Sequence, residues 1–239
     1  MARFEVLTRD QQRIARIQLT NESAHVEAGA IHELRGDLEI VPQGAGASAL
    51  GRAMAGQTVV RNVVRGSGEL FLGPPTFGEL AVLTLRGEGW ILDHGAYVAS
   101  VGDVTVGFVR NGARAAVRGG EGWIQSTVRG QGEVLVRAPG RLERVDLDDD
   151  ELVVDGNFAV ARTDDLHYTV RRLGGVVGGF TSGEGVVQVY RGTGSVLLAP
   201  IANLWEAIQA ARQPSRKKKR GSSSGRRWAD LLGEAMDLS

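Results

Sequence analysis

The chain has 239 residues, of which 42% are hydrophobic and 23% charged, values typical of a soluble protein with one large or two ordinary domains. It contains no cysteine, which excludes disulfide frameworks, thiolate metal sites and cysteine nucleophiles. No apolar run reaches the roughly 18–20 residues that a membrane-spanning helix needs. The polar N-terminal residues do not resemble a secretory signal, so we expect a cytoplasmic protein.

The formal net charge of zero conceals a difference between the body of the chain and its C-terminal region. Residues 212–227 hold eight bases and no acid, and all the lysines of the chain lie there. Residues 1–211 hold 20 of the 28 bases and 25 of the 28 acids, so the body is net acidic. We therefore place a change of organisation near residue 212.

Three stretches of the body resemble one another at a nearly constant period, which indicates an internal repeat. The motif Arg-Gly-x-Gly begins at Arg65, Arg129 and Arg191, which are 64 and then 62 residues apart. Alternating apolar pairs recur at a similar spacing: Ile17/Leu19, Leu83/Leu85 and Val145/Leu147. We expect three copies of one unit, at about residues 1–78, 79–140 and 141–200.

The repeated unit is predicted to be all-β. Gly accounts for 34 residues, a share that turn-rich β folds tolerate and helices do not. We interpret three polar breaks as equivalent hairpin turns: Thr20–Ser23, Arg86–Gly89 and Asp148–Glu151. The Gly-x-Gly of each repeated motif is interpreted as a second hairpin turn. One unit of about 60 residues cannot bury both faces of its sheet, whereas three units packed around a shared axis can.

Four features of the body carry a family resemblance: Phe71–Pro74, Trp90–Tyr97, the Gly-Glu-Gly motifs at 120–122 and 183–185, and Glu151–Asp155. Over about residues 3–200 the chain resembles the "altered inheritance of mitochondria, number twenty-four" family. The resemblance implies a TRAP-like fold, similar to the trp RNA-binding attenuation protein. In it, short double-stranded β-helix units are triplicated in one chain as a pseudo-threefold β-prism.

The resemblance also implies relatives among small bacterial cytosolic proteins of uncharacterised function. Fungal mitochondrial members of this family are linked to the architecture of the inner membrane. The N-terminal residues of this chain lack the amphipathic Arg/Ser pattern of a mitochondrial presequence. We therefore do not expect that mitochondrial role here.

The residue patterns predict no catalytic, cofactor-binding or metal-binding site, and we do not expect an enzyme. The four histidines form no His-x-His pair of the cupin type: His25, His32, His94 and His167. The acidic run from Asp146 to Glu151 suggests calcium, but it lacks EF-hand spacing and has no counterpart in the other copies, so we interpret it as a solvated turn. There is no Gly-x-Ser-x-Gly elbow and no phosphate-binding loop with Lys.

The repeated arginines Arg65, Arg129 and Arg191 allow two interpretations. In the structural interpretation, each anchors a hairpin by pairing with Glu121, Glu184 or another strand carboxylate, for which the planar guanidinium is well suited. In the functional interpretation, the three form a ring that binds an anion on the pseudo-threefold axis. We favour the structural interpretation.

Gly-rich segments with basic and apolar residues precede one strand in each copy: Gly44–Gly56, Arg110–Gly120 and Arg171–Gly183. Threefold symmetry would gather these loops at one end of the prism, which predicts a contact surface for a protein partner or an anionic membrane. Its key residues are Arg52, Arg114, Arg118, Arg172 and Phe180. The alternative is a set of flexible hairpin tips without a partner.

The C-terminal region is predicted to have three parts. Residues 201–212 form a helix packed on the body, residues 213–225 a basic flexible linker, and residues 226–239 an amphipathic docking helix. The basic cluster of the linker comprises Lys217, Lys218, Lys219 and Arg220. The apolar face of the docking helix includes Trp228, Leu231, Leu232 and Met236. A helix this short is marginal in isolation, so we expect it to dock on a partner.

These features together predict a non-enzymatic scaffold or adaptor without a cofactor. The C-terminal helix would bind a protein partner, and the basic linker could hold an anionic membrane. The alternative is an anion- or nucleic-acid-binding module that uses the Arg-rich loop end and the basic tail. Nucleic acid is the weaker prediction, because the body is acidic and only 5% of the residues are aromatic, whereas single strands bind by stacking on aromatic side chains.

Overall fold

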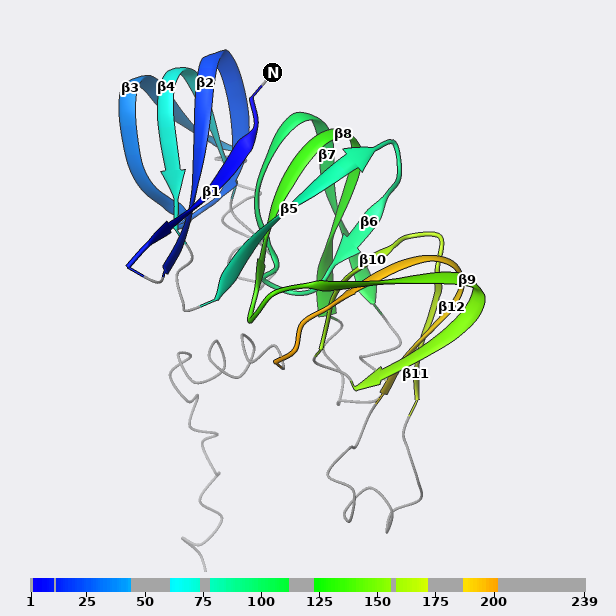
Figure 1. The fold of residues 1–239 in the computed structure, drawn as a ribbon. Helices are drawn as coiled ribbons and strands as arrows, with labels where there is room; N and C mark the ends of the chain where they lie inside the picture. The colour runs from blue at the N-terminus through cyan, green and yellow to red at the C-terminus, as the bar shows by residue number, and fades with distance from the viewer. Residues whose placement is uncertain are drawn as a thin grey trace, which may run out of the picture. The chain divides into compact units, whose positions relative to one another are not determined.

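The structure, a computed structural model, describes residues 2–10, 12–43, 61–73, 78–111, 123–155, 158–171 and 187–201. The chain divides into two compact units, Met1–Glu206 and Ala207–Ser239, and all described residues belong to the first. The described residues form strands and no helix, and the strands join in one twelve-stranded sheet (Figure 1). The prediction of an all-β body is therefore confirmed for this part of the chain.

The strands fall into three consecutive groups, which Figure 1 shows in blue and cyan, in greens, and in yellow-green to orange. The first strand group is β1 Phe4–Arg9, β2 Gln12–Glu27, β3 Ile31–Gln43 and β4 Arg61–Leu72. The second is β5 Glu79–Arg86, β6 Trp90–Leu92, β7 Tyr97–Asn111 and β8 Trp123–Ala138. The third is β9 Glu143–Asp155, β10 Ala159–Thr163, β11 His167–Arg171 and β12 Val187–Leu198.

Each group is built around one long central strand with antiparallel partners on both sides. In the first group, β4 lies between β2 and β3. In the second, β8 has β5 and β6 on one side and β7 on the other. In the third, β12 has β9 on one side and β10 and β11 on the other. A central strand with two neighbours satisfies its backbone hydrogen bonds within its own group.

The repeated Gly-x-Gly lies inside these central strands, so the predicted hairpin turn is wrong. The first Gly of each motif has a positive φ, of 127° at Gly66, 120° at Gly130 and 112° at Gly192. A Cβ at Gly66 would lie 2.2 Å from the carbonyl oxygen of Asp37. Gly here lets a long strand bend while both neighbouring strands stay in close register, a role that Gly also has at β-bulges.

Two of the three predicted polar turns are likewise parts of continuous strands. Thr20–Ser23 lies within β2 and Asp148–Glu151 within β9, and only Arg86–Gly89 separates two strands, β5 and β6. The register of β2 shifts between Thr20 and Glu22, and that of β12 against β9 between Gly192 and Gly194. A polar residue at a bulge resembles a turn in sequence, because both interrupt the apolar alternation.

A residue with positive φ faces the glycine motif in each group: Asn21, Gly87 and Asp149. The backbone N–H of Asn21 donates to Ser67 Oγ at 2.9 Å, and that of Asp149 donates to Thr193 Oγ1 at 3.1 Å. The N–H of Gly87 donates to the carbonyl of Gly130 at 3.0 Å. The bend in the central strand is therefore matched by a bend in the neighbouring strand in the first and third groups, and by the turn between β5 and β6 in the second.

The three groups are linked in a row by two short junctions. At the first junction, β2 pairs with β7 as Ala24↔Val101, His25↔Ser100 and Val26↔Ala99. At the second junction, β6 pairs with β10 as Trp90↔Thr163, Ile91↔Arg162 and Leu92↔Ala161. Apolar clusters extend across both junctions, since Leu135 belongs to the first cluster and Ala161 to the second.

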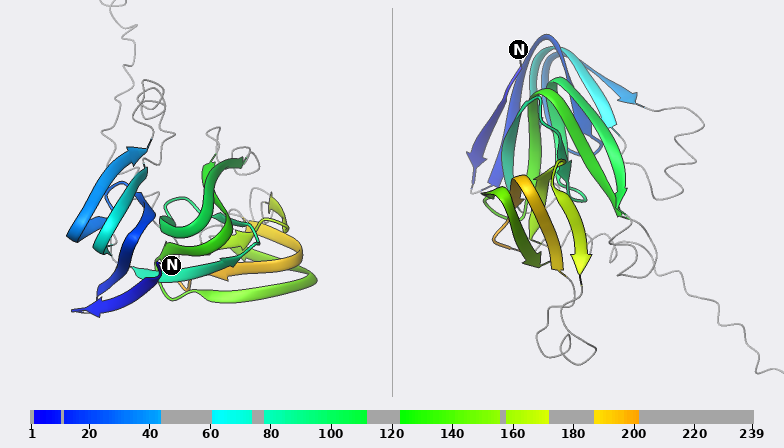
Figure 2. Two further views of the ribbon diagram at one scale, coloured as in Figure 1. Left: turned by 90° about the horizontal axis from the view of Figure 1, so that it is seen from above. Right: turned by 90° about the vertical axis from the view of Figure 1, so that its right-hand side faces the viewer.

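The two ends of the row are formed by β3 and β9, which lie far apart in both Figure 1 and Figure 2. Among the described residues, β3 pairs only with β4 and β9 only with β12. Closure of the three groups around a shared axis would need a third junction between these two strands. The described pairings contain the first two junctions, and closure stays a prediction.

Candidate functional site

The two surfaces predicted from the sequence lie outside the described residues. This holds for the loop-end residues Arg52, Arg114, Arg118, Arg172 and Phe180. It also holds for the tail residues Lys217, Lys218, Lys219, Arg220, Trp228, Leu231, Leu232 and Met236. Of the helix predicted over 201–212, only Ile201 is described, and its side chain is exposed.

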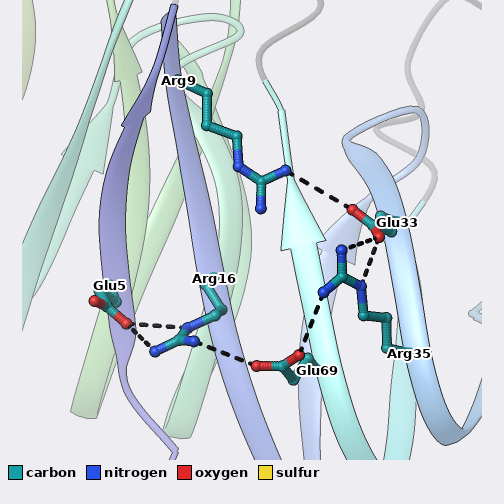
Figure 3. A network of polar contacts seen from close by, with 6 residues as sticks. All are labelled: Glu5, Arg9, Arg16, Glu33, Arg35 and Glu69. Carbon is teal, nitrogen blue, oxygen red and sulfur yellow. Dashed lines mark hydrogen bonds and ion pairs between the residues drawn. The ribbon is translucent and has the colours of Figure 1, made fainter.

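An alternating chain of Glu and Arg crosses the first strand group from β1 to β3 (Figure 3). The members of this ionic network are Glu5, Arg16, Glu69, Arg35, Glu33 and Arg9. Arg16 bridges two strands, with Nη2 2.5 Å from Glu5 Oε2 and Nη1 3.3 Å from Glu69 Oε1. Arg35 Nη2 lies 2.6 Å from Glu33 Oε1 and completes the network on β3.

The ionic network covers the buried ring of Phe71. The guanidinium carbons of Arg9 and Arg35 lie 5.1 and 5.0 Å from the centroid of this ring, and Phe71 is 2% exposed. Because the arginine side chains are about half exposed, each ion pair contributes at most about 1 kcal/mol. The network therefore acts mainly as a charged cover over an apolar residue, with its charges neutralised in pairs.

The repeated arginines each lie beside a carboxylate. Arg65 Nη2 is 2.8 Å from Glu39 Oε2, Arg129 pairs with Asp164, and Arg191 pairs with Glu151. These contacts agree with the structural interpretation, although the predicted partners Glu121 and Glu184 lie outside the described residues. A ring of three arginines open to an anion is the weaker interpretation, because each guanidinium is already engaged.

A buried ion pair spans the first junction. Arg137 Nη2 on β8 lies 2.7 Å from Glu27 Oε2 on β2, and the Arg137 side chain is 6% exposed. Burial raises the pKa of Glu27, and the positive charge of Arg137 opposes this rise. Beside this pair, the Tyr97 hydroxyl lies 3.0 Å from Ser100 Oγ, and burial raises the pKa of Tyr97 to about 12.

The second junction holds a second set of buried polar side chains. Gln125 Nε2 donates to Asp93 Oδ1 at 3.4 Å, and Arg162 Nη1 donates to Gln125 Oε1 at 3.5 Å. The guanidinium of Arg162 also lies 4.4 Å from the ring centroid of Tyr168. All three hydrogen-bonded side chains belong to buried residues. Because Gln125 lies in β8 and Arg162 in β10, these contacts tie the second group to the third.

Asp146, the first acid of the acidic run in β9, has ordinary polar partners. Asp146 Oδ1 accepts from Ser195 Oγ at 2.5 Å and from Arg144 Nε at 2.7 Å, and these contacts hold the pKa of Asp146 below its usual value. Within the described ranges, no group of three or more His, Asp or Glu side chains is placed to hold a metal ion. The same ranges contain no helix long and apolar enough to cross a membrane.

Comparison with known proteins identifies the family. The family model described as Mitochondrial biogenesis AIM24 matches residues 4–201. The chain belongs to this family. The resemblance stated from the motifs Phe71–Pro74, Trp90–Tyr97 and Glu151–Asp155 is thereby confirmed.

Two Streptococcus pyogenes proteins are similar to this AIM24-family chain. An uncharacterised protein of serotype M6 is 29% identical over 154 residues, which cover 63% of this chain and 62% of that protein. The alignment therefore spans less than two thirds of the relative's own length. A crystal structure of a Streptococcus pyogenes protein matches with a TM-score of 0.71 at 24% identity, over 89% of this chain and 99% of that chain. This second similarity shows a shared fold.

Sequence reasoning missed the buried polar side chains of the two junctions in this AIM24-family body. A signal for one of them existed, since Asp93 follows the apolar triplet Trp90–Leu92. An acid directly after an apolar strand segment indicates a point where a buried edge reaches polar surroundings. Arg137, which pairs with Glu27, and Arg162, which donates to Gln125, lie in other strand groups than these partners, and no local pattern links them.

Proposed function

We propose that this AIM24-family chain is a non-enzymatic cytoplasmic scaffold or adaptor. In this proposal the body consists of three repeats of one β unit that pack as a TRAP-like, pseudo-threefold prism. The tethered C-terminal helix carries the main contact to a protein partner or an anionic membrane surface. The observation that carries the proposal is the edge-to-edge strand junction between groups, which occurs twice within the chain.

The pairing registers support the proposed repeat. On one side of the central strands, three pairs lie at the same distance before the bent glycine: Ala24↔Val64, Trp90↔Val128 and Leu152↔Tyr190. On the other side, three pairs lie at the same distance after it: Leu34↔Leu70, Ser100↔Val134 and Arg162↔Val196. We therefore treat the members of each set as equivalent positions of the unit.

The two junctions use equivalent positions of the unit. Ala24 and Trp90 are equivalent on one side of the junction, and Ser100 and Arg162 on the other. Two junctions with the same register favour a unit whose edge is suited to receive another strand. This property favours a scaffold over an enzyme, because the unit assembles polypeptide rather than enclosing a small substrate.

The C-terminal region supplies the second contact surface of the proposal. Its eight bases within residues 212–227 would be attracted to an anionic membrane by about 1 kcal/mol each near the surface. The apolar face with Trp228, Leu231 and Leu232 would then enter a groove of a partner or the membrane interface. The two features act together, since the basic segment raises the local concentration of the helix at its target.

The test compares full-length variants that leave the body unchanged. Leu231→Glu/Leu232→Glu alters the apolar face, and Asp230→Asn/Asp237→Asn is the matched control on the polar face. Co-purification of the partner, identified by mass spectrometry, is expected to be lost only in the first variant. An equal yield of the same partner with both variants would refute the role of the helix.

The basic run favours one second candidate, an anion- or nucleic-acid-binding module. A variant with Gln in place of Lys217, Lys218, Lys219 and Arg220 separates it from the adaptor. If the tail binds single-stranded RNA, this variant loses affinity and the wild-type affinity falls steeply as salt rises. Absence of binding at low salt would dismiss this second candidate.

A further inference from the structure

We propose that the edge of β9 at Leu152–Val154, which pairs with no second strand among the described residues, is a docking site for one extended segment of another protein. That segment contains the motif Ala-x-Val or Ala-x-Thr, and the first and third side chains of the motif face the apolar cluster. The proposal rests on the repeated unit proposed above and not on closure of the prism, since a junction between β3 and β9 of the same chain would occupy this edge. It names a partner surface of the scaffold that is separate from the tail.

The triplet Leu152–Val154 occupies the position that makes both junctions in the other groups. Ala24–Val26 and Trp90–Leu92 each pair with their own central strand on one side and with the next group on the other. Leu152–Val154 pairs with the central strand β12 at Tyr190, Val189 and Gln188. Among the described residues, its other side has no strand partner.

The exposure of this triplet differs from that of its equivalents. Ala24, Val26, Trp90 and Leu92 are at most 1% exposed, because the next group covers them. Leu152 and Val154 are half-buried, and Val153 is 42% exposed. The third apolar cluster thus remains partly open on the side where the first two are covered. A strand of a partner that pairs here would bury this apolar surface, which favours binding.

The two junctions define the side chains that this edge accepts. Opposite Val26 and Leu92, the positions equivalent to Val154, lies Ala in both cases: Ala99 and Ala161. Opposite the positions equivalent to Leu152 lies a β-branched residue in both cases: Val101 and Thr163. The junction strands therefore read Ala-Ser-Val and Ala-Arg-Thr. Small and β-branched residues let the two strands approach closely over an apolar face.

The chain's own free strand does not carry this motif. The equivalent positions on β3 are Glu33, Leu34 and Arg35, and both charged side chains belong to the ionic network of Figure 3. Pairing β3 of a second copy with β9 would bury these charges against Leu152 and Val154, which is costly without new partners. Such charges on an edge strand are a known protection against edge-to-edge association.

Pairing of β9 with β9 of a second copy is opposed by its own charges. Asp150 precedes the triplet and Asp155 follows it, whereas Glu151 is paired with Arg191, so two such edges would bring the like charges of Asp150 and Asp155 together. The same carboxylates favour a segment with basic residues next to its Ala-x-Val or Ala-x-Thr. The occupant that fits is therefore an extended, basic segment of a different protein.

The first experiment measures binding of a fluorescent peptide to the full-length protein by anisotropy. The peptide repeats Ala159–Thr163 with one lysine added at each end, and the control peptide has Glu and Arg in place of its second Ala and its Thr. We expect the control to bind about tenfold more weakly or worse, because it would bury two charges. The Leu152→Lys variant should lose the preference, whereas Val82→Lys, at an exposed apolar residue of β5, should keep it.

The second experiment gives β3 the side chains of β7. Glu33→Ala/Arg35→Val is expected to associate head to tail, with a mass in light scattering that rises with concentration. Adding Leu152→Lys should restore the wild-type mass. Glu5→Gln/Arg16→Gln breaks the same ionic network away from the edge and should leave the mass unchanged.

Three outcomes would overturn the proposal: equal binding of both peptides, no association of the β3 variant, or wild-type self-association that Leu152→Lys abolishes. The third would show that the charges of β3 do not exclude a second copy. None of the variants in these measurements alters residues 213–239. Failure of the tail experiment with a retained peptide preference would therefore refute the adaptor role of the tail alone.

Discussion

Arg137 and Glu27 form an ion pair of 2.7 Å across the first junction, although 110 residues separate them in the chain. The pair joins the end of β8 in the second group to the end of β2 in the first. Its neighbours are apolar core residues on both strands, such as Val26 and Val136, each 0% exposed. The junction thus combines backbone pairing, apolar burial and one buried charge pair.

Removal of one member of this pair is expected to destabilise the body strongly. Glu27→Ala leaves the Arg137 guanidinium buried without its carboxylate, which we expect to cost about 3 kcal/mol. The free energy of unfolding from urea titration measures this. The double variant Glu27→Leu/Arg137→Met should be less destabilised than Glu27→Ala, because no charge remains buried. If the double variant is less stable than Glu27→Ala, this expectation is wrong, and the ion pair stabilises the junction by more than the avoidance of an unpaired buried charge.

The bent central strands predict unequal effects of the same substitution at the first glycines of two Arg-Gly-x-Gly motifs. Gly130 and Gly192 have similar positive φ, 120° and 112°, but a Cβ at Gly130 would lie 2.1 Å from the carbonyl oxygen of Asp103. A Cβ at Gly192 would meet no atom within 4 Å. Gly192→Ala is expected to cost about 1–3 kcal/mol from backbone strain, and Gly130→Ala about 1–3 kcal/mol more from the clash.

Chemical denaturation of both glycine variants measures this difference. Because each variant adds the same methyl group at a similar φ, the difference isolates the close approach of the neighbouring strand. Equal destabilisation would mean that strand β7 moves away from Gly130 at little cost.

The recurrence of Arg-Gly-x-Gly indicated strands at the right places, but their local geometry was wrong. Arg65, Arg129 and Arg191 lie in the long central strands β4, β8 and β12. A glycine with positive φ has the same sequence signature in a bend as in a hairpin turn. The two differ in whether the strand keeps the same neighbours on both sides of the glycine, and that is a non-local property.

The functional surfaces were less accessible to sequence reasoning than the fold. The loop-end and tail residues stay predictions, because they lie outside the described residues. The edge at Leu152–Val154 was visible in sequence only as an apolar triplet. Its significance depends on the register with β12 and on the charged residues Glu33 and Arg35 at the other end of the row, which only the pairings relate to it.

Tyr97 is expected to titrate far above an ordinary tyrosine. Burial raises its pKa from 10.0 to about 12, whereas the hydrogen bond with Ser100 and the charge of Arg61 lower it. A folded pKa above the unfolded value contributes stability that is present below pH 10 and lost as the pH rises towards 12. Tyr97→Phe should remove a phase near pH 12 from the tyrosinate absorbance titration and flatten the alkaline loss of stability.

Asp146 gives the opposite pH dependence, on the acid side. The hydroxyl of Ser195 is the main cause that lowers the pKa of Asp146 below 3.8, and Arg144 contributes next. A folded pKa below the unfolded value contributes stability that is fully present above the unfolded pKa and is lost as the pH falls through the folded pKa. Ser195→Ala should therefore raise the pKa of Asp146 towards 3.8, as measured by NMR titration of its carboxyl carbon. The pKa should rise less in Arg144→Gln, and a larger rise there would make the charge of Arg144, rather than the hydroxyl, the main cause.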